Sequence, residues 1–141
     1  MSYSILIVDD SLPMRSVIKR TLKAAGYGNT DILEAANGQE AVDLLKNSWV
    51  DIIMTDYNMP VMNGLELIKI IKNDEVSKDI PVVIISTEGN ESKIKEFMDC
   101  GAAGYITKPF TAEAIRDLIV KILGDADYEE DIDGSDDDFD F

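Results

Sequence analysis

The sequence predicts an α/β protein built on a parallel β-sheet. Four short apolar runs, each bounded by polar residues, occur along the 141-residue chain: Ile5–Val8, Ile52–Thr55, Val82–Ile85 and Tyr105–Thr107. Runs of this kind are typical of strands that are buried on both faces, as in parallel sheets. Segments with apolar residues at helical spacing separate the runs, and this alternation is the pattern of a doubly wound α/β domain.

The first half of the chain predicts two strand–helix units. Pro13 follows the first strand at a position that favours the first turn of a helix. One face of this helix carries apolar residues at helical spacing: Met14, Val17, Ile18 and Leu22. The glycine-containing segment 26–28 ends the helix, and Ile32 and Leu33 lie in a second strand. A turn at 37–38 leads to a second helix with the apolar residues Ala41, Leu44 and Leu45.

The second half repeats the alternation three times. A loop over 57–64 follows the third strand, and Pro81 opens the fourth strand. The third and fourth helices are marked by apolar residues at helical spacing: Leu65, Ile68 and Ile71, then Ile94, Phe97 and Met98. The turn 101–104 leads into the fifth strand, and a last helix begins at Thr111 and ends near Leu123. Right-handed crossovers with helices on both faces favour a flavodoxin-like sheet, although the sequence alone leaves the strand order open.

Length, charge and composition favour one domain with an acidic extension. Residues 124–141 hold ten acids and no Lys or Arg, whereas residues 1–123 hold 18 acids and 13 bases. We therefore expect a folded domain over 1–123 and a disordered acidic tail over 124–141.

Several classes of function are disfavoured by the same composition. The net charge of −15 argues against nucleic-acid binding, and the absence of histidine excludes histidine-based catalysis. No apolar run approaches the roughly 20 residues of a membrane span, and no secretion signal precedes the first strand. The single cysteine, Cys100, agrees with a reducing compartment. We expect a cytoplasmic protein that does not bind membranes.

Polar residues end four of the predicted strands. Asp9 and Asp10 follow the first, Asp56 the third, Ser86 the fourth and Lys108 the fifth. The carboxyl ends of parallel strands meet at one edge of a sheet, so these side chains are expected to share a crevice. Three carboxylates suit Mg²⁺, which shares its sites with phosphate oxygens, and an aspartate is an adequate nucleophile toward a phosphoryl group. Singly, each residue has an ordinary interpretation as a helix cap, a loop acid or a surface lysine; all of them at strand ends indicate a phosphoryl-transfer site.

Four motifs resemble the receiver domain of two-component response regulators. They are Ile7–Asp10, Thr55–Pro60, Ile85–Glu88 and Gly104–Phe110. The resemblance covers residues 4–123 and is strongest to the single-domain chemotaxis regulators. It implies a flavodoxin-like, five-stranded parallel sheet in the order 2-1-3-4-5 with five helices.

The resemblance also implies a role for each residue of the site. Asp56 would be the phosphoacceptor, and Mg²⁺ would be bound directly by Asp10, Asp56 and the backbone carbonyl of Asn58, with Asp9 acting largely through a water. Ser86 and Lys108 would contact the phosphoryl group. The Lys108–Pro109 peptide bond would be cis.

Further positions would control switching and the lifetime of the phosphate. Tyr105 would turn inward when Ser86 is drawn to the phosphate; its alternative is a half-buried edge-strand aromatic residue. Asn58 and Glu88 match the chemotaxis regulators at positions that tune self-dephosphorylation. Thr87 is larger than the residue usual there, so the lifetime stays open. Asn63 replaces a common acid and should affect only the turn.

The implied function is that of a stand-alone response regulator in chemotaxis or motility signalling. A histidine kinase would supply the phosphoryl group to Asp56 in a Mg²⁺-dependent reaction, and the chain would catalyse only its own phosphorylation and dephosphorylation. We expect a monomer that docks on a partner such as a flagellar switch protein or a phosphatase. The expected docking face is a basic cluster on the fourth helix, fifth strand and fifth helix: Lys93, Lys95, Tyr105, Lys108, Arg116 and Lys121.

The acidic tail lies beyond the resemblance. Four apolar residues interrupt its acids, Tyr128, Ile132, Phe139 and Phe141, which is typical of segments that fold on a partner. One hypothesis is that the tail competes for the basic face of its own domain. A calcium loop through Glu129, Asp131, Asp133, Gly134 and Asp140 is the weaker alternative, because the loop departs from the usual pattern and no helix follows it.

Three rival functions remain at this stage. An aspartyl-phosphate phosphatase acting on small molecules would carry Asp-x-Asp after the first strand, whereas this chain has adjacent Asp9 and Asp10. A receiver could also drain phosphate from a kinase without binding a target, or serve a pathway other than chemotaxis.

Overall fold

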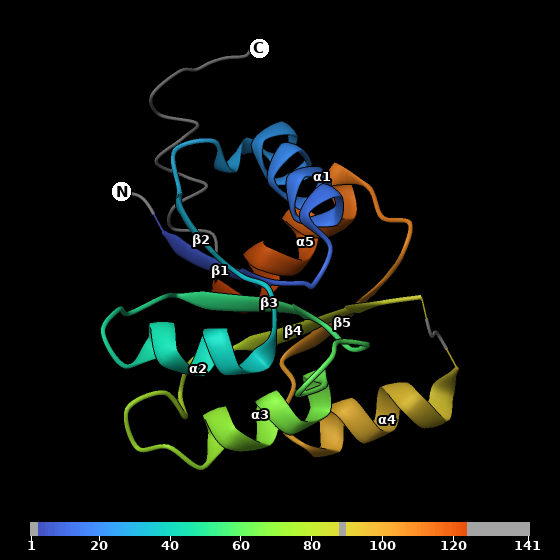
Figure 1. Cartoon of the computed structure of the whole chain (residues 1–141). Helices are drawn as coiled ribbons and strands as arrows, with labels where there is room; N and C mark the ends of the chain where they lie inside the picture. Colours follow the sequence, from blue (N-terminus) through green and yellow to red (C-terminus); the bar gives the residue numbers. More distant parts are fainter. Residues whose placement is uncertain (1–2, 88–89, 124–141) are drawn as a thin grey trace.

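The computed structural model describes residues 3–87 and 90–123, which form a three-layer α/β sandwich (Figure 1). The strands are β1 (Ser4–Val8), β2 (Asp31–Ala35), β3 (Ile52–Asp56), β4 (Val82–Ser86) and β5 (Gly104–Thr107). The helices are α1 (Leu12–Leu22), the π-helical turn η1 (Lys23–Tyr27), α2 (Gly38–Leu45), α3 (Gly64–Lys72), α4 (Glu91–Asp99) and α5 (Ala112–Leu123). Helices α1 and α5 cover one face of the sheet, and α2, α3 and α4 cover the other.

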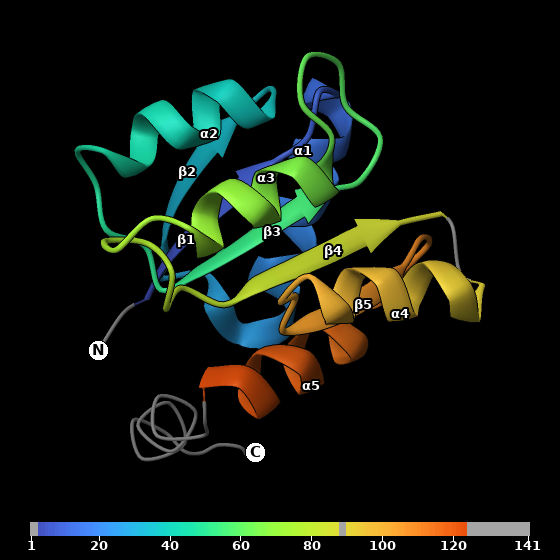
Figure 2. The same ribbon diagram turned by 90° about the horizontal axis from the view of Figure 1, so that it is seen from below.

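The sheet is parallel throughout, with the strand order β2-β1-β3-β4-β5 (Figure 2). The predicted flavodoxin-like fold and strand order are therefore confirmed. The chain places β2 on one side of β1 and then β3, β4 and β5 on the other side, so the order of the strands reverses at β1. In such sheets the crevice for ligands opens beyond the carboxyl ends of the strands next to this point.

Alternate residues of the central strands enter two separate cores. In β1, Leu6 and Val8 pack toward α2, α3 and α4, whereas Ile5 and Ile7 pack toward α1 and α5. All five residues of β3 and of β4 are buried. Because both faces are covered, each strand needs apolar residues at consecutive positions, which explains the continuous runs in the sequence.

Polar side chains cap the helices that begin at the carboxyl edge of the sheet. Ser11 caps α1 and Asn37 caps α2 by accepting a backbone N–H of the first turn. Asn63 and Glu66 form a reciprocal capping box at the start of α3, and Asn90 caps α4. These caps leave Asp9 and Asp10 free of a capping role, so the helix-cap interpretation of this acid pair is wrong.

The expectations for the acidic tail and for Glu88 lie outside the described residues. They include the disorder of 124–141, its competition for the docking face and the calcium loop. Within the described ranges, no helix is long and apolar enough to cross a membrane.

Candidate functional site

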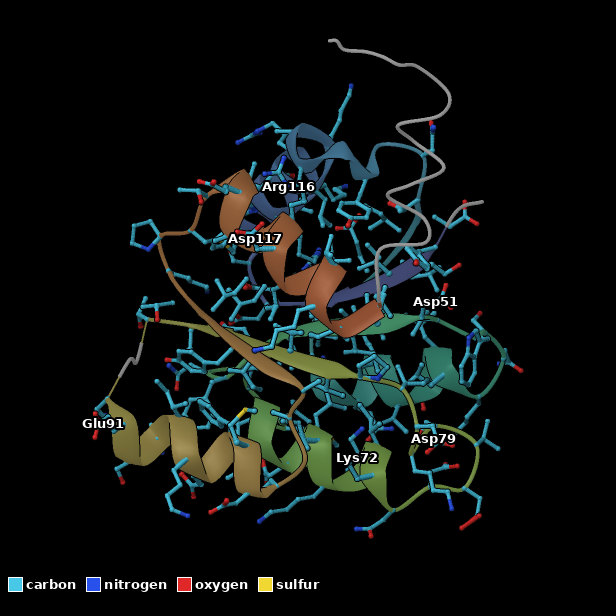
Figure 3. All side chains as sticks on the ribbon, turned by 180° about the vertical axis from the view of Figure 1, so that it is seen from behind. Asp51, Lys72, Asp79, Glu91, Arg116 and Asp117 are labelled. Carbon is cyan, nitrogen blue, oxygen red and sulfur yellow. The ribbon has the colours of Figure 1, made fainter. Side chains whose placement is uncertain are left out.

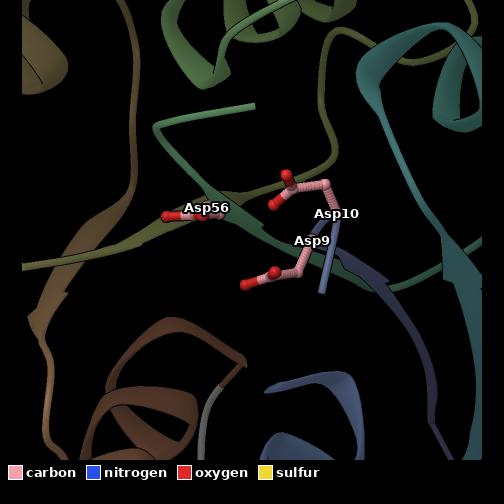
Figure 4. Close-up of side chains that lie close together, drawn as sticks. All are labelled: Asp9, Asp10 and Asp56. Carbon is pink, nitrogen blue, oxygen red and sulfur yellow. The ribbon is translucent and has the colours of Figure 1, made fainter. Parts of the chain in front are cut away.

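The three predicted carboxylates converge at the carboxyl edge of the sheet (Figure 4). Asp9 and Asp10 follow β1, and Asp56 ends the neighbouring strand β3. One carboxylate oxygen from each residue lies within 4.8 Å of the others. Asp9 and Asp56 are buried and Asp10 is exposed, so the cluster has a buried floor and an open side.

Lys108 reaches this cluster from the end of β5. Its Nζ lies 3.5 Å from Asp9 Oδ2 and 3.4 Å from Asp56 Oδ1, and its side chain is 15% exposed. The Lys108–Pro109 peptide bond is cis, as the resemblance implied. The ends of β1, β3 and β5 therefore meet, as the sequence predicted.

Backbone amides fix the two buried carboxylates. Ser11 N donates to Asp9 Oδ1 at 2.9 Å, and Tyr57 N donates to Asp56 Oδ1 at 2.8 Å. The other oxygen of Asp9, Oδ2, is buried without a hydrogen bond among the described residues, and only the longer contact with Lys108 faces it. A buried anionic oxygen without a donor is suited to a cation, and an all-oxygen donor set fits a hard divalent ion such as Mg²⁺.

Opposing effects act on the phosphoacceptor candidate. Burial of Asp56 raises the pKa of its carboxyl above the ordinary value, and the neighbouring Asp9 raises it further. Lys108 and the Tyr57 amide act in the opposite direction because they favour the ionised form. The site therefore holds Asp56 in an environment where its charge is costly until a cation compensates it.

Ser86 lies at the end of β4 and is fully buried. Its carbonyl accepts the Lys108 amide at 2.9 Å, which ties the ends of β4 and β5 together. Thr87 and Asn58 are exposed on the loops that follow β4 and β3. The predicted Ser86 thus ends a strand at the carboxyl edge of the sheet, and Thr87 and Asn58 lie on the loops that follow β4 and β3.

Tyr105 is half-buried on the edge strand β5, and its hydroxyl is buried without a hydrogen bond among the described residues. Its ring stacks on Phe97 of α4, with centroids 5.6 Å apart and an interplanar angle of 21°. The ring of Phe97 also packs against that of Tyr57, the residue after Asp56, with centroids 5.2 Å apart. A line of aromatic rings therefore connects the end of β3 to the candidate switch residue.

The expected basic docking face is altered by intramolecular contacts. Lys93 donates to the Tyr57 hydroxyl at 3.2 Å, and Lys95 pairs with Asp99 at 2.9 Å. Lys108 points into the carboxylate cluster. On α5, Arg116 is followed by Asp117 (Figure 3). Two cations of this face, Lys95 and Lys108, therefore lie against acids of the chain itself.

Two residues of the site escaped the sequence prediction. A Cβ at Gly64 would lie 2.5 Å from the Asp56 carbonyl oxygen and 3.0 Å from Tyr57 Cα, so only glycine lets the start of α3 pack against the backbone of Asp56 and Tyr57. Arg15 of α1 donates to the Asp9 carbonyl oxygen at 2.6 Å. In the sequence, Gly64 indicates only a turn, and Arg15 indicates only a cation on the surface of a helix.

The fold and the site together define a class: a flavodoxin-like domain with an acidic cluster and a lysine at the carboxyl edge of its sheet. The chain belongs to the response regulator receiver domain family, whose pattern matches residues 5–120. This membership places it in two-component signalling.

Named relatives are chemotaxis proteins. The chain is 42% identical over 121 residues to a chemotaxis protein CheY homolog of Campylobacter jejuni, covering 85% of this chain and 92% of the relative. It is 41% identical over 124 residues to the chemotaxis protein CheY1 of Helicobacter pylori, covering 87% and 98%. A structure of the Vibrio cholerae chemotaxis protein CheY4 superposes with a TM-score of 0.78 at 33% identity, covering 86% of this chain and 99% of that one.

Proposed function

We propose that this protein accepts a phosphoryl group on Asp56 in a Mg²⁺-dependent reaction and thereby switches a docking surface. The observation that carries the proposal is the meeting of three carboxylates with Lys108 at one edge of the sheet. A structural role alone would not require a buried carboxylate oxygen without a hydrogen-bond donor at Asp9.

In the proposed reaction, a carboxylate oxygen of Asp56 attacks the phosphorus of a donor. A bond from this oxygen to phosphorus forms, and the bond from phosphorus to the donor's leaving atom breaks. The leaving atom is an imidazole nitrogen in a phosphohistidine kinase or a carboxylate oxygen in acetyl phosphate. The nucleophile must be ionised, and Lys108 favours that form.

The chain's own residues position the phosphoryl group. Lys108 would move from the two carboxylates to the new phosphoryl oxygens, where a compact cation binds strongly. Ser86 would donate its hydroxyl to the same group. Asp10, Asp56 and the Asn58 carbonyl would hold Mg²⁺, with Asp9 acting through a water; bound there, the ion would neutralise charge on the transferring group.

The output is proposed to be docking controlled by Tyr105. Phosphorylation would draw Ser86 toward the phosphate and stabilise the inward position of Tyr105, shifting the population of two states of the face formed by α4, β5 and α5. The similarity to chemotaxis proteins supports a histidine kinase as donor and a flagellar switch protein or a phosphatase as partner. We propose that residues 1–123 perform this function and that 124–141 form a separate acidic tail.

Intact-mass spectrometry of the full chain with acetyl phosphate tests the proposal. We expect one added phosphoryl group in the presence of Mg²⁺, little with chelator, and none in Asp56→Asn. Asp43→Asn, an exposed carboxylate on α2, is the matched control and should be labelled like the parent. Labelling that persists in Asp56→Asn, or that ignores Mg²⁺, would contradict the proposal.

A phosphate sink is the second candidate function, because three of the five cations of the expected docking face are engaged within the chain. Binding of the phosphorylated and unphosphorylated chains to a purified flagellar switch protein separates the two. Binding that increases with phosphorylation supports the switch, and equal or absent binding supports the sink.

A further inference from the structure

The backbone of Asp9 is fixed on both sides by neighbouring elements. Its N–H donates to the Ala35 carbonyl at the end of β2 at 3.0 Å, and its carbonyl accepts Arg15 Nη1 at 2.6 Å. The Asp9 carbonyl and the Asp10 N–H belong to one planar peptide group. The contact with Arg15 therefore sets the direction in which the chain enters Asp10.

Asp10 depends on this backbone restraint. Its side chain is exposed, and within residues 3–87 and 90–123 it forms no hydrogen bond or ion pair. Asp9 and Asp56, in contrast, each accept a backbone amide. The place of the Asp10 carboxylate in the cluster is consequently determined by the peptide group that Arg15 holds.

Arg15 is itself held by an ionic network between α1 and β2. Its Nε donates to Glu34 Oε1 at 2.8 Å, and Lys19 Nζ lies 2.8 Å from Glu34 Oε2. The Arg15 side chain is only 13% exposed. The planar guanidinium contacts both groups at once, the Asp9 carbonyl through Nη1 and Glu34 through Nε.

Charge compensation is the second consequence of the network. The hydrogen bond from Lys19 and then the one from Arg15 hold the pKa of Glu34 below its ordinary value, despite its partial burial. Glu34 is therefore ionised at neutral pH and offsets the charge of Arg15. An uncompensated cation behind Asp9 would oppose the binding of a divalent cation.

We propose that Arg15 is a positioning residue for the cation site, which aims Asp10 through the Asp9 carbonyl while Glu34 orients and neutralises the guanidinium. The inference rests on the proposed function, because the cation is the Mg²⁺ proposed above. Arg15 does not touch the ion or the phosphoryl group. Residues that orient metal ligands in this way change metal affinity by about 10–100-fold.

Calorimetric titration of the full chain with Mg²⁺ tests the proposal directly. Arg15→Met keeps an apolar stem and removes both hydrogen bonds, so its Mg²⁺ affinity should fall by about tenfold. Arg20→Met is the matched control, because Arg20 lies exposed on the same helix and its side chain makes no contact of this kind in the described residues. The control should bind Mg²⁺ as the parent does.

Labelling by acetyl phosphate distinguishes positioning from general damage. At limiting Mg²⁺, Arg15→Met should be labelled more slowly than Arg20→Met. At saturating Mg²⁺ the two rates should become equal, because Asp56, Ser86 and Lys108 are unchanged. A rate that stays low at saturating Mg²⁺ would overturn the inference.

Glu34→Gln provides a second variant if Arg15→Met does not fold. It leaves Arg15 in place but removes the compensating charge, so Mg²⁺ affinity should again fall severalfold. If this variant, or folded Arg15→Met, binds Mg²⁺ as tightly as the parent, the inference about Arg15 is overturned while the proposed function stands. Failure of the parent and of Arg20→Met to bind Mg²⁺ would overturn the proposed function together with it.

Discussion

The contribution of Asp56 to the free energy of unfolding changes with pH. Burial and Asp9 raise the pKa of its carboxyl in the folded state. A carboxyl with a raised folded-state pKa binds its proton more tightly when folded, so the stabilisation it gives is complete below the pKa of the unfolded chain, about 3.9. This stabilisation is lost as the pH rises through the folded-state pKa. The Asp56 carboxyl therefore makes the free energy of unfolding lower at pH 7 than at low pH.

The first prediction is that Asp56→Asn melts at a higher temperature than the parent at pH 7 without Mg²⁺. The difference should shrink as the pH falls well below about 3.9, where the parent carboxyl is protonated in both states. Added Mg²⁺ should raise the melting temperature of the parent more than that of the variant. Calorimetric scans at several pH values measure this, with exposed Asp43→Asn as control; a parent that is more stable than Asp56→Asn at pH 7 would contradict it.

Val61 has an unfavourable backbone conformation in the loop after Asp56. Its φ is +72°, and its side chain is 80% exposed, so packing does not offset the steric cost. A β-branched residue in the left-handed region costs roughly 1–2 kcal/mol. Asn tolerates this region, so Val61→Asn should raise the free energy of unfolding by about 1 kcal/mol in urea titrations. Val76→Asn, at a position 70% exposed and without positive φ, should change it by less than about 0.5 kcal/mol.

The site residues were predictable to the extent that they end strands. Asp9, Asp56 and Lys108 each follow an apolar run, and parallel strands bring such ends together. Arg15 was not predictable in the same way, because its role depends on contacts between α1 and β2 that are far apart in sequence. The contact of Lys95 with Asp99 was likewise not predicted, because a count of lysines does not reveal such pairs.

At the scale of elements, α4 is coupled to the site through its aromatic side. Phe97 is fully buried between Tyr57, which follows β3, and Tyr105 of β5. Lys93 reinforces the contact, since its Nζ lies 4.8 Å from the centre of the Tyr57 ring. A movement of the segment after Asp56 would therefore act first on Phe97 of α4 and through it on Tyr105.

Phe97→Leu should weaken the coupling between α4 and the two tyrosines while it keeps an apolar side chain in the core. We expect a loss of about 1–2 kcal/mol in the free energy of unfolding, because the leucine fills less of the space and loses the aromatic contacts. The ring resonances of Tyr105 in NMR spectra should also shift. Met98→Leu, at a partly exposed position on the same helix, should leave both unchanged; a shift of the Tyr105 resonances in the control would show that the rings are not specifically coupled.

At the scale of the whole molecule, the two edges of the sheet are chemically distinct. The carboxyl edge holds Asp9, Asp56 and Lys108, whereas the single tryptophan, Trp49, precedes β3 at the amino edge and is 57% exposed. Strand β3 separates the two along its whole length.

The emission of Trp49 should therefore be insensitive to Mg²⁺. A fluorescence titration that gives no change at concentrations where calorimetry detects binding would agree with this separation. An emission change that follows the calorimetric isotherm would mean that binding alters the amino edge as well.

The overall architecture was more predictable than its details. Alternating patterns established five strands and five helices, and the resemblance supplied the strand order. The π-helical turn η1 after α1 was not predicted, because Gly26, whose φ is +104°, indicates in the sequence only the end of a helix. The division of the core in two likewise depends on the pleat of the sheet and not on any local pattern.

The described chain begins and ends away from its chemistry. Tyr3 precedes β1 and Leu123 ends α5, and both pack against the core between the sheet and the helices α1 and α5. A fluorescent protein or an affinity handle fused ahead of Tyr3 would thus leave the carboxyl edge open to a bulky phosphodonor. The domain is therefore suited to engineered fusions in which the open side of the carboxylate cluster, at Asp10, stays accessible.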